Sequence, residues 1–405
     1  MRLPHIVACA ALVFVGIAEA QQAPASTWQH VADVRYRGEI KDIELAANGD
    51  IVVSGFSPGV RGYVDGWVAR FDATGRQLWS RLVGGNPRDE ILDLALAPDG
   101  DIVVSGWRDI AAFVSNGLVA RYSPNGDLRW SRTIEVDGSL ALYEIMVRGD
   151  GEVIAAGRHA TRNDTQMHPF MVALDSAGQT RWTFDSYEHS PSPTKMKSAV
   201  VPTSAISLAS DGVIELQQTF NQHAYGECVR VSLETGNLLG GTCDASVPAR
   251  AKSRRGRPTY AAYESGPLAA RDPFVRKFSA SGALVWEKAL TSENNDGAND
   301  VAETADGGAV VAGYETTGDR IDMHNWNGLL IRLGSDGTEI WRRRFGGSRR
   351  DEFTSVAVMP DSSIIVAGYT GSQGDANDWA PWLLRLNSSG ELEGEAKLGL
   401  ERRQN

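Results

Sequence analysis

After its first twenty residues the chain has no long apolar run, and it has no excess of positive charge. Its 405 residues carry a net charge of −11 at pH 7, with 40 Lys and Arg against 51 Asp and Glu. Nucleic acids and anionic membranes bind basic faces, so this balance argues against both as general partners. Since no later stretch reaches the length that a bilayer requires, the sequence also predicts no membrane span.

Helical periodicity and catalytic sequence motifs are missing as well. Beyond the N-terminal segment, apolar residues do not recur at the spacing of a helix. No phosphate-binding loop, Ser-His-Asp pattern or paired-carboxylate motif stands out. The histidines that could converge as metal ligands match no known zinc spacing; they are His159, His168, His223 and His324. We therefore predict no catalytic residue and assign no metal ligand from these motifs.

The first twenty residues have the order of a secretory signal. Arg2 supplies a positive start, Ile6 to Ile17 is apolar, and Ala18-Glu19-Ala20 has the form of a cleavage site. A buried N-terminal helix is the alternative interpretation. We expect export to the periplasm or the extracellular space, with residues 1–20 removed and residues 21–26 forming a short linker.

Cysteine is scarce, with three residues in the whole chain. Removal of the signal would take away Cys9 and leave Cys228 and Cys243. An even count in an oxidising compartment suggests a disulfide. These two residues lie at equal distances from a predicted hairpin turn at Glu234–Asn237, and facing residues of a hairpin lie close together. We predict a disulfide between them, with two buried free thiols as the alternative.

A short phrase that recurs seven times organises the chain. Two strands flank a Gly turn, and Trp follows the Gly by four residues. The clear copies are Gly75/Trp79, Gly126/Trp130, Gly178/Trp182, Gly282/Trp286 and Gly337/Trp341, and the weaker copies at Gly236 and Gly390 have Gly240 and Gly394 at the tryptophan position. A repeat of roughly 50 residues with several short strands is typical of a β-propeller.

Six of the seven repeats also carry an upstream hairpin. In the first copy, Asn48-Gly49 joins a strand at Ile43–Ala46 to a β-branched strand at Ile51–Gly55. We therefore predict an all-β fold, a seven-bladed β-propeller of four-stranded antiparallel blades over residues 27–400. The blades lie near residues 40–85, 91–135, 142–186, 204–243, 256–290, 298–347 and 353–399, and residues 401–405 form a tail. The fifth unit lacks a clear upstream hairpin partner.

The two ends of the chain must meet if the ring closes. Thr27–Val31 resembles the outer strand around Trp79 but lacks the rest of a blade, and the last unit has Gly394 where its tryptophan belongs. Unpaired strand edges at an open seam are costly. We predict that Trp28 brings the N-terminal strand into the last blade and closes the ring.

The repeated tryptophans are expected to lie between neighbouring blades, where the ring is buried and its N–H reaches a carbonyl. This docking role falls to Trp28, Trp79, Trp130, Trp182, Trp286 and Trp341. The phrase Ala173–Trp182 resembles the tryptophan-docking motif of the quinoprotein-like propellers, and the whole unit resembles the repeats of exported bacterial propellers. The resemblance implies architecture. Quinone dehydrogenases of that superfamily carry adjacent cysteines and a calcium site, and no matching residues are present here, so we predict no cofactor.

Acidic residues mark one mouth of the predicted central channel. Alignment of the hairpins places Asp42, Asp93, Glu144 and Asp300 in one column, and a repeated Arg-Asp-Glu sequence adds Asp89, Glu90, Asp351 and Glu352. In one interpretation each acid of the column caps backbone N–H groups of its own turn. In the other, the ring attracts a cation, and calcium suits an all-oxygen site.

The variable loops between second and third strands share a face and carry the aromatic residues Trp67, Trp326 and Trp379. Aromatic rings beside amides and carboxylates suit sugars or peptides, although ordinary loop composition would look similar. The sequence favours an exported, monomeric, non-enzymatic propeller that binds a protein partner or an envelope glycan through this face. The alternative is an enzyme with its site at the channel mouth, a lyase, a hydrolase or a quinoprotein-like oxidoreductase.

Overall fold

A computed structural model describes most of the repeat region. The described residues are 38–58, 64–85, 88–111, 114–161, 167–189, 204–210, 213–219, 226–239, 260–265, 272–279, 283–290, 296–316, 325–372 and 379–397. Within these ranges the regular structure is β-strand except for one short helix, α1 (Ser186–His189). No helix in the same ranges is long and apolar enough to cross a membrane.

The strands of the described ranges form seven antiparallel sheets. The first three contain β1 (Glu39–Leu45), β2 (Ile51–Pro58), β3 (Val64–Phe71) and β4 (Gln77–Val83); β5 (Asp89–Leu96), β6 (Ile102–Ala111), β7 (Val114–Tyr122) and β8 (Leu128–Ile134); and β9 (Gly138–Val147), β10 (Val153–Thr161), β11 (His168–Leu174) and β12 (Thr180–Asp185). In each sheet the strands follow one another in chain order.

The remaining sheets continue this order. They contain β13 (Ser204–Ser210), β14 (Val213–Thr219), β15 (Gly226–Ser232) and β16 (Leu238–Leu239); β17 (Tyr260–Ser265), β18 (Asp272–Phe278) and β19 (Leu284–Ala289); β20 (Asp296–Glu303), β21 (Ala309–Thr316), β22 (Trp326–Leu333) and β23 (Glu339–Phe345); and β24 (Asp351–Val358), β25 (Ile364–Thr370), β26 (Ala380–Leu386) and β27 (Leu392–Lys397). The predicted all-β fold of repeated four-stranded antiparallel sheets is confirmed, and the fifth sheet shows three strands.

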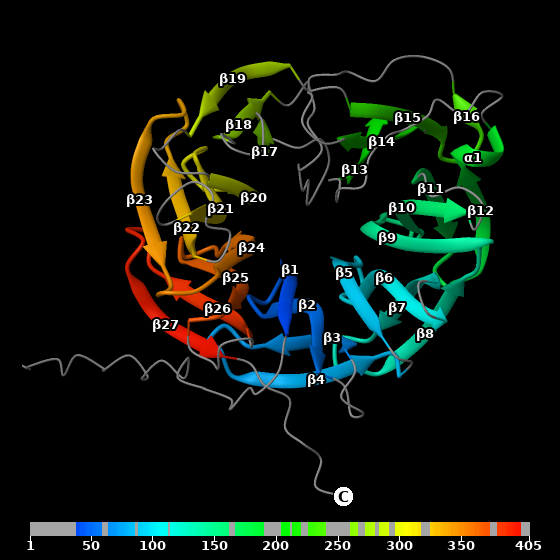
Figure 1. The fold of residues 1–405 in the computed structure, drawn as a ribbon, viewed down its shortest axis with the longest axis horizontal. Coiled ribbons are helices and arrows are strands. Elements are labelled where there is room, and N and C mark those ends of the chain that lie inside the picture. The colour runs from blue at the N-terminus through cyan, green and yellow to red at the C-terminus, as the bar shows by residue number, and fades with distance from the viewer. Residues whose placement is uncertain are drawn as a thin grey trace, which may run out of the picture.

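The sheets stand around a common axis, with the first strand of each sheet nearest that axis and the last strand on the outside (Figure 1). The second strands, such as Ile51–Val53, are buried on both faces because a neighbouring sheet packs on each side. Val52 and Val68 of the first sheet share one apolar cluster with Ile91 and Val104 of the second. The core of the molecule is therefore a series of layers between sheets.

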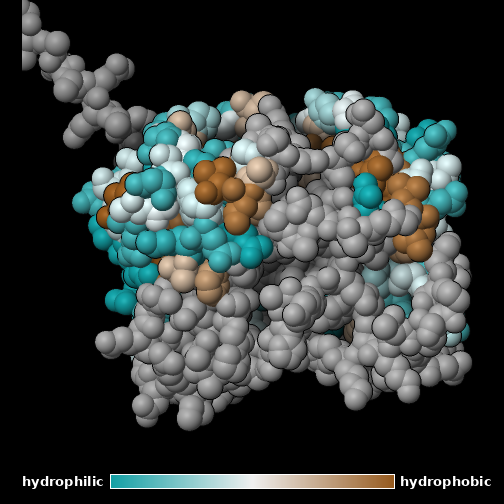
Figure 2. All heavy atoms as spheres, turned by 90° about the horizontal axis from the view of Figure 1, so that it is seen from above, coloured by the Kyte–Doolittle hydropathy of each residue, from teal (hydrophilic) through white to brown (hydrophobic). Residues whose placement is uncertain are grey.

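The outer strands expose some aliphatic side chains to solvent. Leu238 of β16 and Val285 of β19 are examples, with exposed fractions of 48% and 55%. Figure 2 shows the side that carries these two strands, where apolar atoms lie in separate groups among hydrophilic ones. Single exposed aliphatic residues need no functional explanation.

A tryptophan on each of five outer strands contacts the following sheet. The Trp79 indole N–H donates to the Pro124 carbonyl at 2.9 Å. The equivalent bonds run from Trp130 to Ser176, Trp182 to Leu233, Trp286 to Ser335 and Trp341 to Ser388, at 3.0, 2.8, 3.0 and 3.3 Å. The ring lies against the turn glycine of that sheet, so a Cβ at Gly126 would stand 2.7 Å from Trp79.

The first and last sheets also contact each other. Ile40 and Trp67 lie in one apolar cluster with Ile365 and Leu383 of the last sheet. The Arg385 guanidinium donates to the Ala73 carbonyl at 2.8 Å, and Gly38 N–H donates to the Trp379 carbonyl at 3.1 Å. Trp28 and the rest of Thr27–Val31 lie outside the described residues, so their predicted place in the last sheet stays a prediction.

The docking contact predicts a large effect of one added methyl group. Gly126 has a φ of +82° and touches the Trp79 ring, so Gly126→Ala should lower the free energy of unfolding by about 2 kcal/mol or more, through backbone strain and overpacking. Gly149 is the matched control, because its φ is not in the left-handed region and its added Cβ meets nothing within 4 Å. Urea unfolding should show Gly149→Ala within about 1 kcal/mol of the parent; equal losses in both variants would contradict the docking argument.

Candidate functional site

The acidic column predicted from the hairpins occupies one register position of the inner strands. In β1, β5, β9, β20 and β24, Asp42, Asp93, Glu144, Asp300 and Ser355 pair with Ser54, Ser105, Ala156, Ala312 and Ala367. Directly before this position each of these strands has a β-bulge. The extra residues that the bulges insert are Lys41, Leu92, Tyr143, Asn299 and Thr354. Bulges bend a strand and redirect its side chains, and they are common beside functional sites.

The column aspartates connect neighbouring sheets through backbone N–H groups. Asp42 accepts the N–H of Ile43 at 2.7 Å and that of Leu94, in the next sheet, at 3.3 Å. Asp93 accepts the N–H of Ile145, again in the next sheet, at 2.8 Å. These carboxylates are buried, with exposed fractions of 0% for Asp42 and 4% for Asp93.

The same arrangement joins the sixth sheet to the last, and Ser355 links the last sheet to the first. Asp300 accepts the N–H groups of Val301 and Val356 at 2.8 and 2.9 Å, and the Ser355 hydroxyl lies within hydrogen-bond distance of both Asp300 and Asp42, at 2.8 and 3.1 Å. Asp42 and Asp300 thus accept an N–H of their own strand, as the capping interpretation predicts, and also an N–H from the next sheet. The expected shared cation finds no support, because within the described ranges no group of three or more His, Cys, Asp or Glu could hold a metal.

The acids of the repeated Arg-Asp-Glu sequence lie on two different faces of the strand. Asp89 and Asp351 are fully buried and accept the N–H of Gly85 and Gly347 at 2.8 and 2.9 Å, which fixes the turn before each inner strand. Both carboxylates therefore have a structural role, and their predicted part in binding stays a prediction. Because successive side chains of a strand point to opposite faces, the neighbouring Glu90 and Glu352 face away from these turns.

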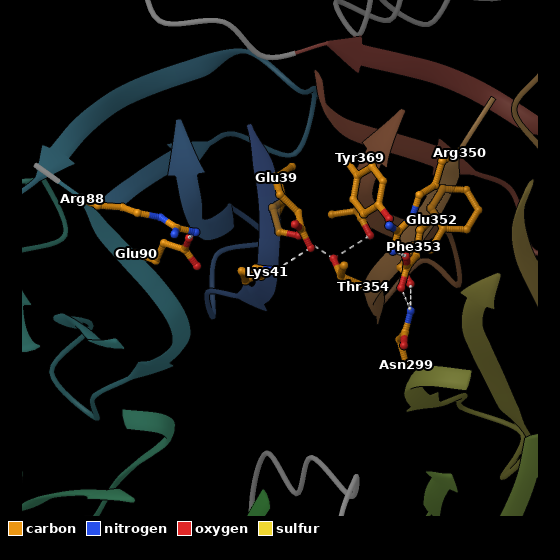
Figure 3. A network of polar contacts seen from close by, with 12 residues as sticks. Glu39, Lys41, Arg88, Glu90, Asn299, Arg350, Glu352, Phe353, Thr354 and Tyr369 are labelled. Atoms are coloured by element: carbon orange, nitrogen blue, oxygen red, sulfur yellow. Dashed lines mark hydrogen bonds and ion pairs between the residues drawn. The ribbon is translucent and has the colours of Figure 1, made fainter. Parts of the chain in front are cut away.

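Six charged residues at the beginning of β24, β1 and β5 form what we call the axial cluster: Glu39, Lys41, Arg88, Glu90, Arg350 and Glu352 (Figure 3). They make three ion pairs, Lys41–Glu39 at 2.6 Å, Arg88–Glu90 at 2.8 Å and Arg350–Glu352 at 3.2 Å. Asn299 adds a hydrogen bond to Glu352 at 2.9 Å. The cluster therefore contains three carboxylates that each already have a cationic partner.

Aromatic rings accompany each ion pair. The residues opposite Glu39, Glu90 and Glu352 in register are Phe56, Trp107 and Tyr369. Lys41 lies 5.4 Å from the centre of the Phe56 ring, and Arg88 lies 5.2 Å from that of Trp107. Arg350 lies 4.0 Å from the Trp326 ring and 5.5 Å from the Tyr369 ring. Such contacts hold a cation over a ring face and restrict its motion.

Burial and neighbouring charges change the acidity of this cluster. Burial raises the pKa of Glu39, and Glu352 and Glu90 raise it further, while Lys41 acts in the opposite direction. Burial alone would lower the pKa of Lys41, but Glu39, Glu90 and Glu352 raise it overall. Burial, together with Glu352, raises the pKa of Tyr369, whose hydroxyl donates to Glu352 at 2.5 Å. Lys41 and Tyr369 therefore keep their protons at neutral pH.

The three tryptophans predicted for the loop face have different positions. Trp67 is 3% exposed and packs in the core between the first and last sheets, away from solvent. Trp326 stacks on Tyr314 with ring centres 4.4 Å apart and contacts Arg350. Trp379 lies 5.9 Å from the Tyr369 ring. Two of the three thus lie beside the axial cluster.

Histidine and cysteine do not form a described site. The His159 ring bonds Asp185 through Nδ1 at 2.6 Å and the Asp137 carbonyl through Nε2 at 3.0 Å, so neither nitrogen is open to a metal. His168 faces it across β10 and β11. The other two histidines, His223 and His324, lie outside the described residues. So does Cys243, and the disulfide to Cys228 stays a prediction.

The His159 contacts predict pH-dependent stability. Burial alone would lower the pKa of His159, but the acceptors Asp185 and Asp137 raise it overall. A raised pKa in the folded state gives stability that is complete below about pH 6.5, the unfolded value, and is lost as pH rises through the folded value. His159→Gln should therefore destabilise the protein by about 1–3 kcal/mol at pH 5.5 and by less at pH 8.5, measured by urea unfolding. Asp185→Asn should show the same trend, and a pH-independent loss in both would contradict the argument.

The comparisons with solved structures concern the fold. Acylaminoacyl peptidase of Pyrococcus horikoshii is 9% identical with a TM-score of 0.46, and the match covers 91% of this chain but 54% of that one. This chain thus spans about half the length of that peptidase. The β-propeller domain of the Trilobed protease from Pyrococcus furiosus (9% identity, TM-score 0.41) matches over 92% of this chain and 98% of its own. The Dos1 propeller (11%, TM-score 0.44) matches over 85% and 93%.

No curated protein matches the sequence. One family does, because residues 64–243 match the sequence model PQQ_2, described as outer membrane protein assembly factor BamB. The match covers the second, third and fourth sheets completely and part of the first. Together with the repeated four-stranded sheets, it shows that this chain contains a quinoprotein-type β-propeller domain similar to that family.

Proposed function

We propose that this protein is an exported, non-enzymatic propeller that binds a glycan through the axial cluster and the loops around it. The observation that carries the proposal is the threefold combination of an ion pair and an aromatic ring on adjacent inner strands. Small-molecule sites usually combine aromatic surfaces with a few fixed polar groups. Sugars offer both a flat apolar face and hydroxyl groups, so the cluster matches their chemistry.

A protein partner would use a broader surface. The polar and aromatic groups that the structure describes here gather at the ends of three strands, which suits a ligand of a few sugar units better. A protein partner at the loop face is therefore the alternative outcome of a binding experiment.

An enzymatic function is the second candidate, and one observation favours it. Glu39 has a raised pKa beside a protonated Lys41, and a carboxyl group of raised pKa is a typical general acid. Each carboxylate of the cluster is held by its own cation, however, which fits binding better than proton transfer. Release of reducing ends or unsaturated products from a bound glycan would favour the enzyme.

Glycan binding should depend on Trp326. On a glycan array, the parent protein should bind at least one envelope-type saccharide, and Trp326→Ala should weaken that binding about tenfold, through loss of an aromatic contact of about 1.4 kcal/mol. Ile340→Ala is the control, because Ile340 is 57% exposed on the outer strand of the same sheet. No bound saccharide, or equal binding by both variants, would refute the proposal.

We also propose that the seven sheets are the blades of a closed ring, with the N-terminal strand in the last blade. The first and last sheets share an apolar cluster, and the Gly38 N–H donates to the Trp379 carbonyl. The chain segment that leads into β1 therefore lies beside the last sheet. β27 has Gly394 at the position where five other outer strands have a docking tryptophan, so β27 provides no indole ring to cover Gly75. In the closed ring, Trp28 would cover Gly75.

Closure gives Trp28 the same role as Trp79. Trp28→Ala should then lower the free energy of unfolding by about 3 kcal/mol, as expected for a large buried aromatic side chain. Trp79→Ala should cause a similar loss, and Thr27→Ala should cause little. A Trp28→Ala protein that unfolds at the same urea concentration as the parent would contradict closure by this strand.

A further inference from the structure

We propose that the glycan is anionic and that Arg88 and Arg350 bind its carboxylate or sulfate groups. The inference rests on the proposed glycan binding and names the chemical class of the ligand. In two of the ion pairs, the cationic and the anionic side chain differ in solvent exposure. The arginine side chains are 56% and 45% exposed, whereas their partners Glu90 and Glu352 are 11% and 13% exposed. A ligand from solvent therefore meets the guanidinium groups before the carboxylates.

Both guanidinium groups are fixed in orientation. Arg88 donates from Nη2 to Glu90 at 2.8 Å and lies over Trp107. Arg350 donates from Nη2 to Glu352 at 3.2 Å and lies over Trp326. A guanidinium has five N–H donors in a planar fork that matches an oxyanion. Each carboxylate bond uses only part of this fork, so further donors remain for a ligand while the plane is already held.

The positions of the cations suit a polymer with repeated charges. Arg88 and Arg350 precede the Asp-Glu sequences of β5 and β24, and they lie on opposite sides of β1 (Figure 3). Lys41, on β1, lies between them and stays protonated because the surrounding glutamates raise its pKa. Three cationic groups therefore follow one another across three adjacent strands. An oligosaccharide with an acid on successive sugars offers an anion to more than one of these groups.

Long-range attraction does not explain such binding. The chain has a net charge of −11, so its overall field repels a polyanion. Within the axial cluster three cations balance three carboxylates. Preference for an anionic glycan would therefore arise from the short-range donors of the two arginines, and it should persist at physiological salt better than binding by a general basic surface.

The test compares charged and neutral forms of the same polymers. Polygalacturonate and its methyl ester, and dextran sulfate and dextran, would be titrated against the full-length protein by calorimetry at physiological salt. We expect at least one anionic form to bind at least tenfold more tightly than its neutral form. Binding of polygalacturonate alone identifies carboxylate as the recognised group, and binding of dextran sulfate alone identifies sulfate.

Two double variants test whether the preference for the anionic polymer depends on Arg88 and Arg350. Arg88→Gln combined with Arg350→Gln should remove the preference for the anionic form. Arg76→Gln combined with Arg129→Gln should keep it, because these arginines are 67% and 55% exposed on the outer part of the sheets. Thermal unfolding verifies that both double variants fold like the parent.

Three results would overturn the inference. Equal binding of charged and neutral polymers would refute it while leaving glycan binding intact. Equal loss in both double variants would assign the preference to general charge. Absence of binding to these polymers and to the glycan array would remove both this inference and the proposed function.

Discussion

The packing of one sheet on the next depends on a contact between an indole ring and a glycine that no side chain can replace. The ring of Trp79 covers Gly126, and its N–H finds a carbonyl in the same turn. A left-handed φ at the glycine makes room for the ring, and the ring buries the turn. Since the same contact recurs on five outer strands, the spacing between sheets is set at the periphery of the molecule.

A second set of contacts fixes the sheets near the axis. Asp42, Asp93 and Asp300 each accept a backbone N–H from the following sheet, so a displaced sheet would leave a buried carboxylate without its donor. Both kinds of contact, the outer tryptophan and the inner aspartate, are present between the first and second, the second and third, and the sixth and seventh sheets. The axial cluster lies beside the inner contacts, and its strand ends are consequently held in fixed relative positions.

Sequence patterns predict most of the fold because they depend on the local preferences of turns and strands. The Asp-Gly hairpins, the turn glycines and the β-branched second strands each predict a strand boundary without knowledge of distant residues. The site is less accessible to such reasoning. The acidic column was found by alignment, but its use of N–H groups from the next sheet depends on packing between repeats.

The axial cluster illustrates the same limit. Glu90 and Glu352 were found through the repeated Arg-Asp-Glu sequence, and that sequence also contained Arg88 and Arg350 as an available signal. Glu39 and Lys41 carry no such repeat, and only the register of β1 brings them into the cluster. Trp67 illustrates another limit, because an aromatic residue beside a variable loop has the same sequence pattern whether it lies at the surface or, as here, in the core.

The bulge in the inner strands separates ladder positions, which hold the sheet together, from one inserted position that pairs with no residue of the neighbouring strand. On either side of it the strand pairs in regular register and supplies contacts that the architecture requires. The inserted residue itself belongs to neither face of the ladder, and the five described cases are a lysine, a leucine, a tyrosine, an asparagine and a threonine. In the five described sheets the inserted position is therefore more varied in chemistry than the ladder positions on either side of it, so the side chains beside the axis differ from sheet to sheet while the ladder stays the same.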